Sequence, residues 1–110
     1  MVLTAIIGAP VATRPLSLRV RRSAAQLGEH VSTWRKLQGL TAEQLAERAG
    51  INRGTLRRLE HGDPAVGSGV LLSVLRALGQ LDRVVEALDP YETDLGRARA
   101  DESLPQRVRR

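Results

Sequence analysis

The apolar residues from Ser23 onward recur at helical spacing. One turn separates the apolar Leu27, Val31 and Trp34, the line continues to Gln38, and the polar residues fall largely on the other side. Gly39 follows directly, and a glycine able to take a positive φ commonly ends a helix. We therefore expect a first helix over residues 23–38, with Trp34 on its inward side as part of the core.

A second helix is expected to begin at Thr41. Gln44 stands three residues later, so the two form a T-x-x-Q capping box, in which the hydroxyl and the amide each satisfy a free backbone N–H group. The helix should end at Gly50, where a positive φ lets the chain turn sharply. The residues expected to face inward are Leu45, Ala46 and Ala49.

Three further helices are indicated. Asn52 is a good N-cap for a helix over Arg53–Glu60, which His61, Gly62 and Pro64 close. A fourth helix ends at Gly79, and its apolar stripe consists of Val70, Leu71, Val74, Leu75 and Leu78. A fifth should be capped by Asp82 and stopped by Pro90, with apolar residues Leu81, Val84, Val85 and Leu88. The pattern thus predicts an all-α domain of five helices over residues 23–90.

The two ends of the chain lack this periodicity. Residues 1–22 contain two prolines and form a predicted arm, with a strand around Leu16–Val20 as one option. Residues 91–110 are charged and interrupted by Gly96 and Pro105, which predicts a tail with a short helix near Arg97–Ser103. Both arms are expected to be flexible.

The net charge of +5 is unevenly distributed. Residues 1–22 hold four arginines and no acid, whereas residues 23–90 hold eight basic and eight acidic residues. The predicted domain is therefore neutral overall. Any surface that binds nucleic acid must depend on where a few basic side chains point, with help from the basic arm.

Composition narrows the function classes. The chain has no cysteine, and its two histidines, His30 and His61, stand in no metal-ligand pattern. No apolar run approaches the roughly 18 residues of a membrane span, and the sequence shows no nucleophile elbow or phosphate-binding loop. We expect a cytoplasmic protein that is not an enzyme, without cofactor or membrane contact. His61 is expected to interact with a helix dipole or, alternatively, with a phosphate.

The second and third helices are separated by Gly50, Ile51 and Asn52, which is the spacing of a helix-turn-helix. At about 100° per residue, Leu56 and Leu59 define the buried face of the third helix. The opposite face carries Arg53, Gly54, Arg57 and Arg58. This face suits double-stranded DNA, because arginine pairs with guanine or with phosphate and glycine permits close approach.

Position along the third helix assigns expected roles. Residues near the start of a recognition helix reach base edges, which favours Asn52, Arg53 and Arg57 as readers of sequence. Thr55 and Arg58 lie further round and suit phosphates. The alternative is that Arg57 and Arg58 form only a solvated face.

The segment GLTAEQLAERAGINRGTLRRLEHG resembles the Cro/C1-type helix-turn-helix family of regulators, and the resemblance covers about Leu27–Leu88. It implies a lambda-repressor-like fold and a structural ion pair between Arg35 and Glu60. Relatives often have a phosphate-binding glutamine where this chain has Ala42, so Thr41 or Gln44 would have to supply that contact.

A narrower resemblance is carried by HGDPAVGSGVLLSVLRALGQLDRVVEAL and by LGRARADESLPQRVRR, which are similar to antitoxins that pair with HipA-type kinase toxins. It implies a dimer that represses its own operon and holds a toxin inactive. Two readings follow: an autorepressor on a palindromic operator, or an inhibitor that acts mainly through its tail.

The apolar residues of the last two helices also favour a homodimer, since a small domain cannot bury all of them. A two-fold dimer would set its recognition helices about 34 Å apart and predicts an inverted-repeat operator. If the fifth helix packs entirely inside, the protein would instead be monomeric in solution.

Overall fold

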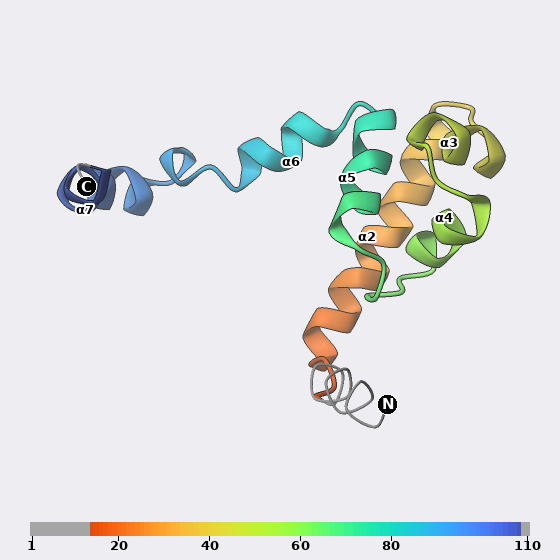
Figure 1. Ribbon diagram of the computed structural model, residues 1–110, viewed down its shortest axis with the longest axis horizontal. Helices are drawn as coiled ribbons and strands as arrows, with labels where there is room; N and C mark the ends of the chain where they lie inside the picture. Colours follow the sequence, from red (N-terminus) through yellow and green to blue (C-terminus); the bar gives the residue numbers. More distant parts are fainter. Residues whose placement is uncertain (1–13, 109–110) are drawn as a thin grey trace, which may run out of the picture.

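The computed structural model describes residues 14–108, and every regular element in this range is helical (Figure 1). The elements are α2 (Leu18–Leu37), α3 (Ala42–Ala49), α4 (Arg53–Glu60), α5 (Ser68–Ala77), α6 (Leu81–Ala87), the 3-10 helix η2 (Pro90–Glu92) and α7 (Asp94–Val108). The prediction of an all-α, lambda-repressor-like fold is confirmed.

Helix α2 begins earlier than the pattern predicts. Ser17 is its N-cap, and the Ser17 hydroxyl accepts a hydrogen bond from the Val20 N–H at 3.1 Å. The start expected at Ser23 and the strand expected around Leu16–Val20 are therefore wrong, because this cap starts a run free of proline and glycine that extends the helix. The first 13 residues of the predicted arm lie outside the described part.

The predicted capping box at the start of α3 is confirmed. Thr41 Oγ1 accepts from the Gln44 N–H at 3.1 Å, and Gln44 Oε1 accepts from the Thr41 N–H at 2.9 Å. Gly50 ends the helix at φ 72°, the left-handed conformation that only glycine takes at little cost. Asn52 Oδ1 then caps α4 by accepting from the Thr55 N–H at 2.7 Å. These contacts define the turn between the two helices.

Helices α2 to α5 enclose one apolar core. Helix α3 packs on α5, and α4 packs on both α2 and α3. The core residues are Val31, Leu40, Leu45, Ala46, Leu56, Leu59, Val74 and Leu78. Trp34 packs against this core while remaining partly exposed, and Leu27, expected on the inward line, is 40% exposed.

Helix α6 leaves the bundle, and the segment after it projects away from the other helices (Figure 1). No α6 residue is buried, and its N-cap is Gln80 without a side-chain bond, so the cap expected at Asp82 is wrong. The tail helix is longer than predicted. Thr93 Oγ1 accepts from the Gly96 N–H at 2.9 Å and starts a helix that runs to Val108, through the expected interruptions.

Candidate nucleic-acid interface

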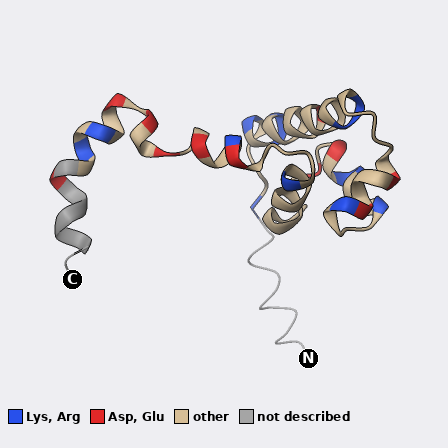
Figure 2. Cartoon of the chain, turned by 90° about the horizontal axis from the view of Figure 1, so that it is seen from above, with Lys and Arg blue, Asp and Glu red and all other residues tan. Residues whose placement is uncertain are grey.

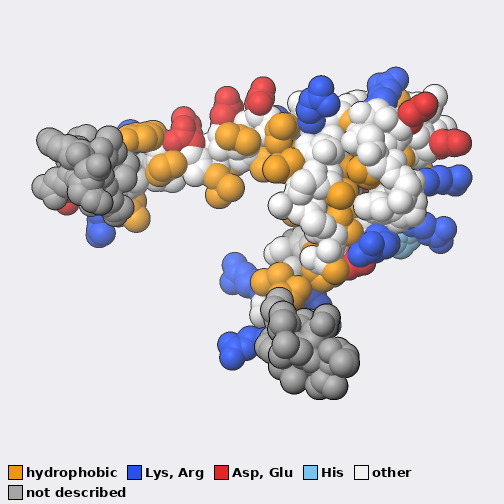
Figure 3. All heavy atoms as spheres, viewed as in Figure 1, with side chains coloured by type: hydrophobic (Ala, Val, Ile, Leu, Met, Phe, Trp, Pro, Cys, Tyr) orange, Lys and Arg blue, Asp and Glu red, His pale blue; other side chains and the backbone are white. Residues whose placement is uncertain are grey.

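The basic residues of α4 lie on the face that points away from the core. Leu56 and Leu59 are buried, whereas Arg53, Gly54, Arg57 and Arg58 are exposed. Basic side chains gather at the end of the molecule where α4 lies (Figure 3). The structure thus brings the four residues together on one solvent-facing surface, which we call the α4 basic face.

Asn52 has part of its hydrogen-bonding capacity committed to the fold. Its Oδ1 accepts from the Thr55 N–H, and Thr55 is half-buried. The exposed Nδ2 group remains a donor. While it caps α4, Asn52 can donate to a base or a phosphate but cannot make the two-point contact with adenine that needs both amide atoms.

The three arginines of the α4 basic face differ in their partners. Arg58 Nε donates to Asp63 Oδ2 at 2.8 Å, in a pair whose side chains are 53% and 33% exposed. Among the described residues, no ion pair involves Arg53 or Arg57. Their guanidinium groups are therefore the more available cations on this face.

Asp63 organises the turn that follows α4. Its Oδ1 accepts from the Ala65 N–H at 2.9 Å, while its Oδ2 accepts from Arg58. The pKa of the Asp63 carboxyl is held below its ordinary value, mainly by the hydrogen bond from the Ala65 N–H and to a smaller extent by the bond from Arg58. An Asp-Pro pair after a helix is a turn signal, but sequence reasoning missed the bond from Arg58 to Asp63.

Thr41 and Gln44 sit exposed at the N-terminus of α3. Each uses its oxygen as an acceptor within the capping box, so the Thr41 hydroxyl hydrogen and the Gln44 Nε2 group are still able to donate. Ala42 packs against the core. Helix N-termini favour anions, and both donors suit a phosphate at this position.

The ion pair implied for Arg35 and Glu60 is present. Arg35 Nε donates to Glu60 Oε2 at 2.8 Å and Nη2 to Oε1 at 3.1 Å. The hydrogen bond with Glu60 raises the pKa of Arg35 above its ordinary value. With side chains 14% and 10% exposed, this pair links α2 to the end of α4.

Gly28 brings α2 and α4 together at the same place. A Cβ atom at this position would overlap the Leu59 carbonyl oxygen and lie 2.7 Å from the Glu60 carbonyl oxygen. Only glycine permits this approach. Sequence reasoning missed it, and the signal was a glycine inside an otherwise helical pattern.

His61 ends α4. Its Nδ1 lies 2.8 Å from the Arg57 carbonyl oxygen, and because a carbonyl only accepts, Nδ1 carries the proton of this bond. The contact satisfies one of the last carbonyl groups of α4. His61 therefore interacts with the C-terminus of α4, which agrees with the expectation that it interacts with a helix dipole.

A comparison with known protein families agrees with the arrangement of α3 and α4. Residues 31–83 match the family model described as Helix-turn-helix. The matched stretch contains α3, α4 and α5, and it is similar to helix-turn-helix domains of DNA-binding regulators. Neither the curated proteins nor the solved structures that were compared gave a match.

None of the helices in the described range is long and apolar enough to cross a membrane.

Proposed function

We propose that this chain is a sequence-specific transcription regulator that reads double-stranded DNA with the α4 basic face. Arg53 and Arg57 are the principal readers of base edges, and Asn52 is an additional donor. The expected backbone contacts come from Thr41, Gln44, Gly54, Thr55 and Arg58. The observation that carries the proposal is the exposure of Arg53 and Arg57 on a capped helix whose other face is fixed in the core.

We further propose that the protein binds a palindromic operator as a homodimer and represses its own operon. Val85 is 60% exposed and Leu88 is 82% exposed, and both lie on or directly after α6, which is apolar on this side. Exposed apolar side chains grouped on one helix are typical of a protein interface. A dimer through α6 would present two α4 helices to successive major grooves.

The test is operator binding by an Arg53→Ala/Arg57→Ala double variant. We expect specific binding to be lost while the helical circular-dichroism signal is retained, since both side chains are exposed. Arg76→Ala/Arg97→Ala is the matched control, because it also removes two exposed arginines, one from α5 and one from α7. Retained specificity in the double variant would refute the proposal.

A second candidate function is that of an antitoxin that neutralises a HipA-type kinase toxin through its tail. It is favoured by the projecting segment, on which Tyr91 is 50% exposed and Leu95 is 66% exposed. Residues 81–96 carry five acidic residues and one arginine (Figure 2), so this segment is unsuited to DNA and suits a protein partner.

Deletion of residues 91–110 separates the two functions. If the tail holds a partner, the deletion should abolish capture of a HipA-type kinase that the full chain binds and leave operator affinity unchanged. If the shortened chain still captures the kinase, the tail is not the partner-binding segment.

A further inference from the structure

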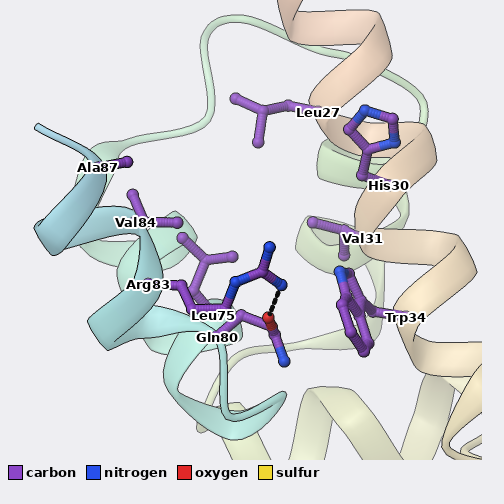
Figure 4. A pocket seen from close by; sticks show the side chains of 9 residues that line it. All are labelled: Leu27, His30, Val31, Trp34, Leu75, Gln80, Arg83, Val84 and Ala87. Carbon is purple, nitrogen blue, oxygen red and sulfur yellow. Dashed lines mark hydrogen bonds between the residues drawn. The ribbon is translucent and has the colours of Figure 1, made fainter.

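An open apolar groove of about 250 Å³ runs between α2 and α6, with Leu75 of α5 at its base. Leu27, Val31 and Trp34 line it from α2, and Val84 and Ala87 line it from α6 (Figure 4). It lies apart from the α4 basic face, none of whose residues lines it. DNA binding by α4 therefore makes no use of it.

One cation is directed into this groove. The Arg83 side chain points from α6 toward α2 (Figure 4), and its guanidinium carbon lies 5.9 Å from the centre of the Trp34 ring. Arg83 Nη1 donates a hydrogen bond to Gln80 Oε1 at 2.7 Å. This bond orients the guanidinium group and occupies only one of its N–H donors. Stacking on the ring adds a favourable cation–π interaction.

The remaining polar lining contains no negative charge. His30 and Gln80 are the other polar residues that line the groove, and no aspartate or glutamate does so. Asp82 and Glu86 lie on α6 but are not part of the lining. Apolar walls with a single directed guanidinium are complementary to a molecule that has an apolar body and one carboxylate.

We propose that the groove binds a small apolar carboxylate, a role separate from DNA recognition. Its hydrocarbon part would contact Leu27, Val31 and Val84, and its carboxylate would accept hydrogen bonds from Arg83. At roughly 30 Å³ for each water-sized group, the volume corresponds to about eight non-hydrogen atoms. Octanoate has an apolar chain and one carboxylate and is slightly larger than this, so the end of its chain would extend out of the open groove.

A second copy of the chain is the competing occupant. The most exposed apolar side chains of this region, Val85 and Leu88, do not line the groove, so a dimer formed through these two residues would not have to fill it. A ligand that contacts both α2 and α6 would fix the direction of α6. An effect of the ligand on operator affinity would rest on the proposed function, whereas binding of the ligand to the groove does not depend on it.

Trp34 provides a direct measurement, because it is the only tryptophan of the chain and lines the groove. The intact protein is titrated with octanoate, 1-octanol and octylammonium while Trp34 fluorescence is recorded. We expect saturable binding of octanoate. The uncharged alcohol and the cation should bind at least about tenfold more weakly, which is the loss expected for one charge-assisted hydrogen bond. Equal binding of octanoate and octanol would overturn the proposal.

Two variants and a control locate the site. Arg83→Gln should reduce octanoate affinity about tenfold without changing the weak binding of octanol, and Ala87→Leu should block both by filling the groove. Arg76→Gln is the control, because it removes an exposed arginine from α5 that does not line the groove. An equal loss in Arg76→Gln and Arg83→Gln would mean nonspecific attraction by net charge and would overturn the assignment.

Protein concentration distinguishes the competing occupant. If a second copy fills the groove, Trp34 fluorescence will change with protein concentration and octanoate will have no effect, which refutes the proposal. The proposal is supported if Trp34 fluorescence responds to octanoate while the oligomeric state of the protein, whether monomer or dimer, does not change. Neither readout involves DNA, so failure of the DNA-binding proposal would leave this result unchanged.

Discussion

Arg35 and Glu60 meet through two hydrogen bonds although 25 positions separate them in the chain. The third donor, Arg35 Nη1, binds the Leu40 carbonyl oxygen at 3.0 Å. One guanidinium thus joins α2, the end of α4 and the residue before the N-cap of α3. Because these three segments carry the helix-turn-helix, the pair fixes the position of α4 relative to the other helices.

Replacing Glu60 by alanine should lower the free energy of unfolding by about 2–3 kcal/mol, because it leaves a mostly buried guanidinium without its partner. Chemical denaturation followed by circular dichroism measures the change. Arg97→Ala is the matched control, since the pair of Arg97 with Asp94 is exposed, and its loss should cost less than about 0.5 kcal/mol. Equal losses in both variants would show that burial of the Arg35–Glu60 pair contributes nothing.

Gly28 and Gly69 give opposite expectations for the same substitution. Gly28→Ala should destabilise the fold by about 2 kcal/mol or more, because the new methyl group overlaps the carbonyl oxygens at the end of α4. Gly69 lies in the first turn of α5 with open space around it, so Gly69→Ala should stabilise the fold by about 0.5 kcal/mol through helix propensity. Thermal denaturation of both variants tests this. A neutral Gly28→Ala would refute the close approach of α2 to α4.

The parts of the fold that sequence predicted best depend on contacts within a few residues. The helix caps consist of hydrogen bonds between residues three or four positions apart, and their residue types signal those bonds directly. Such bonds occur in the Thr41–Gln44 capping box, at Gly50, and between Asn52 and Thr55. The outward direction of the α4 arginines follows from the same local periodicity. These features needed no knowledge of the tertiary structure.

The features that were missed depend on how distant segments meet. The contact of Gly28 with the end of α4 joins residues more than 30 positions apart, and helical spacing alone does not show it. The groove beside Leu27 exists because α6 diverges from α2; helical spacing placed Leu27 on the inward side but did not predict the direction of α6. The start of α2 is a different case: Ser17 is a local cap, but two nearby prolines obscured it.

The pKa of Asp63 gives a prediction on acid stability. It is lowered from 3.8, mainly by the Ala65 N–H and then by Arg58, so its NMR titration midpoint should lie below that value. A carboxyl with a lowered pKa stabilises the fold above its unfolded pKa, and this contribution is lost as the pH falls through the folded one. Arg58→Ala should raise the midpoint only part of the way, because the Ala65 bond remains. Full return to the ordinary value would contradict this order of causes.

Asp63 should also limit how strongly Arg58 binds DNA. Asp63→Asn removes the ion pair, while the asparagine Oδ1 can still accept from the Ala65 N–H and keep the turn. With Arg58 released toward a phosphate, affinity should rise for operator and unrelated DNA alike. The slope of log affinity against log salt should then steepen by about 0.9, the change expected for one added phosphate contact.

The control for this measurement is Asp94→Asn, which makes the same change in net charge at the exposed Arg97–Asp94 pair of α7. Because α7 lies far from α4 on the projecting segment (Figure 1), this variant should leave the salt slope unchanged. Fluorescence anisotropy with a labelled duplex at several salt concentrations gives both slopes. If the two variants behave alike, the effect comes from net charge, and Arg58 does not become a phosphate contact when its partner is removed.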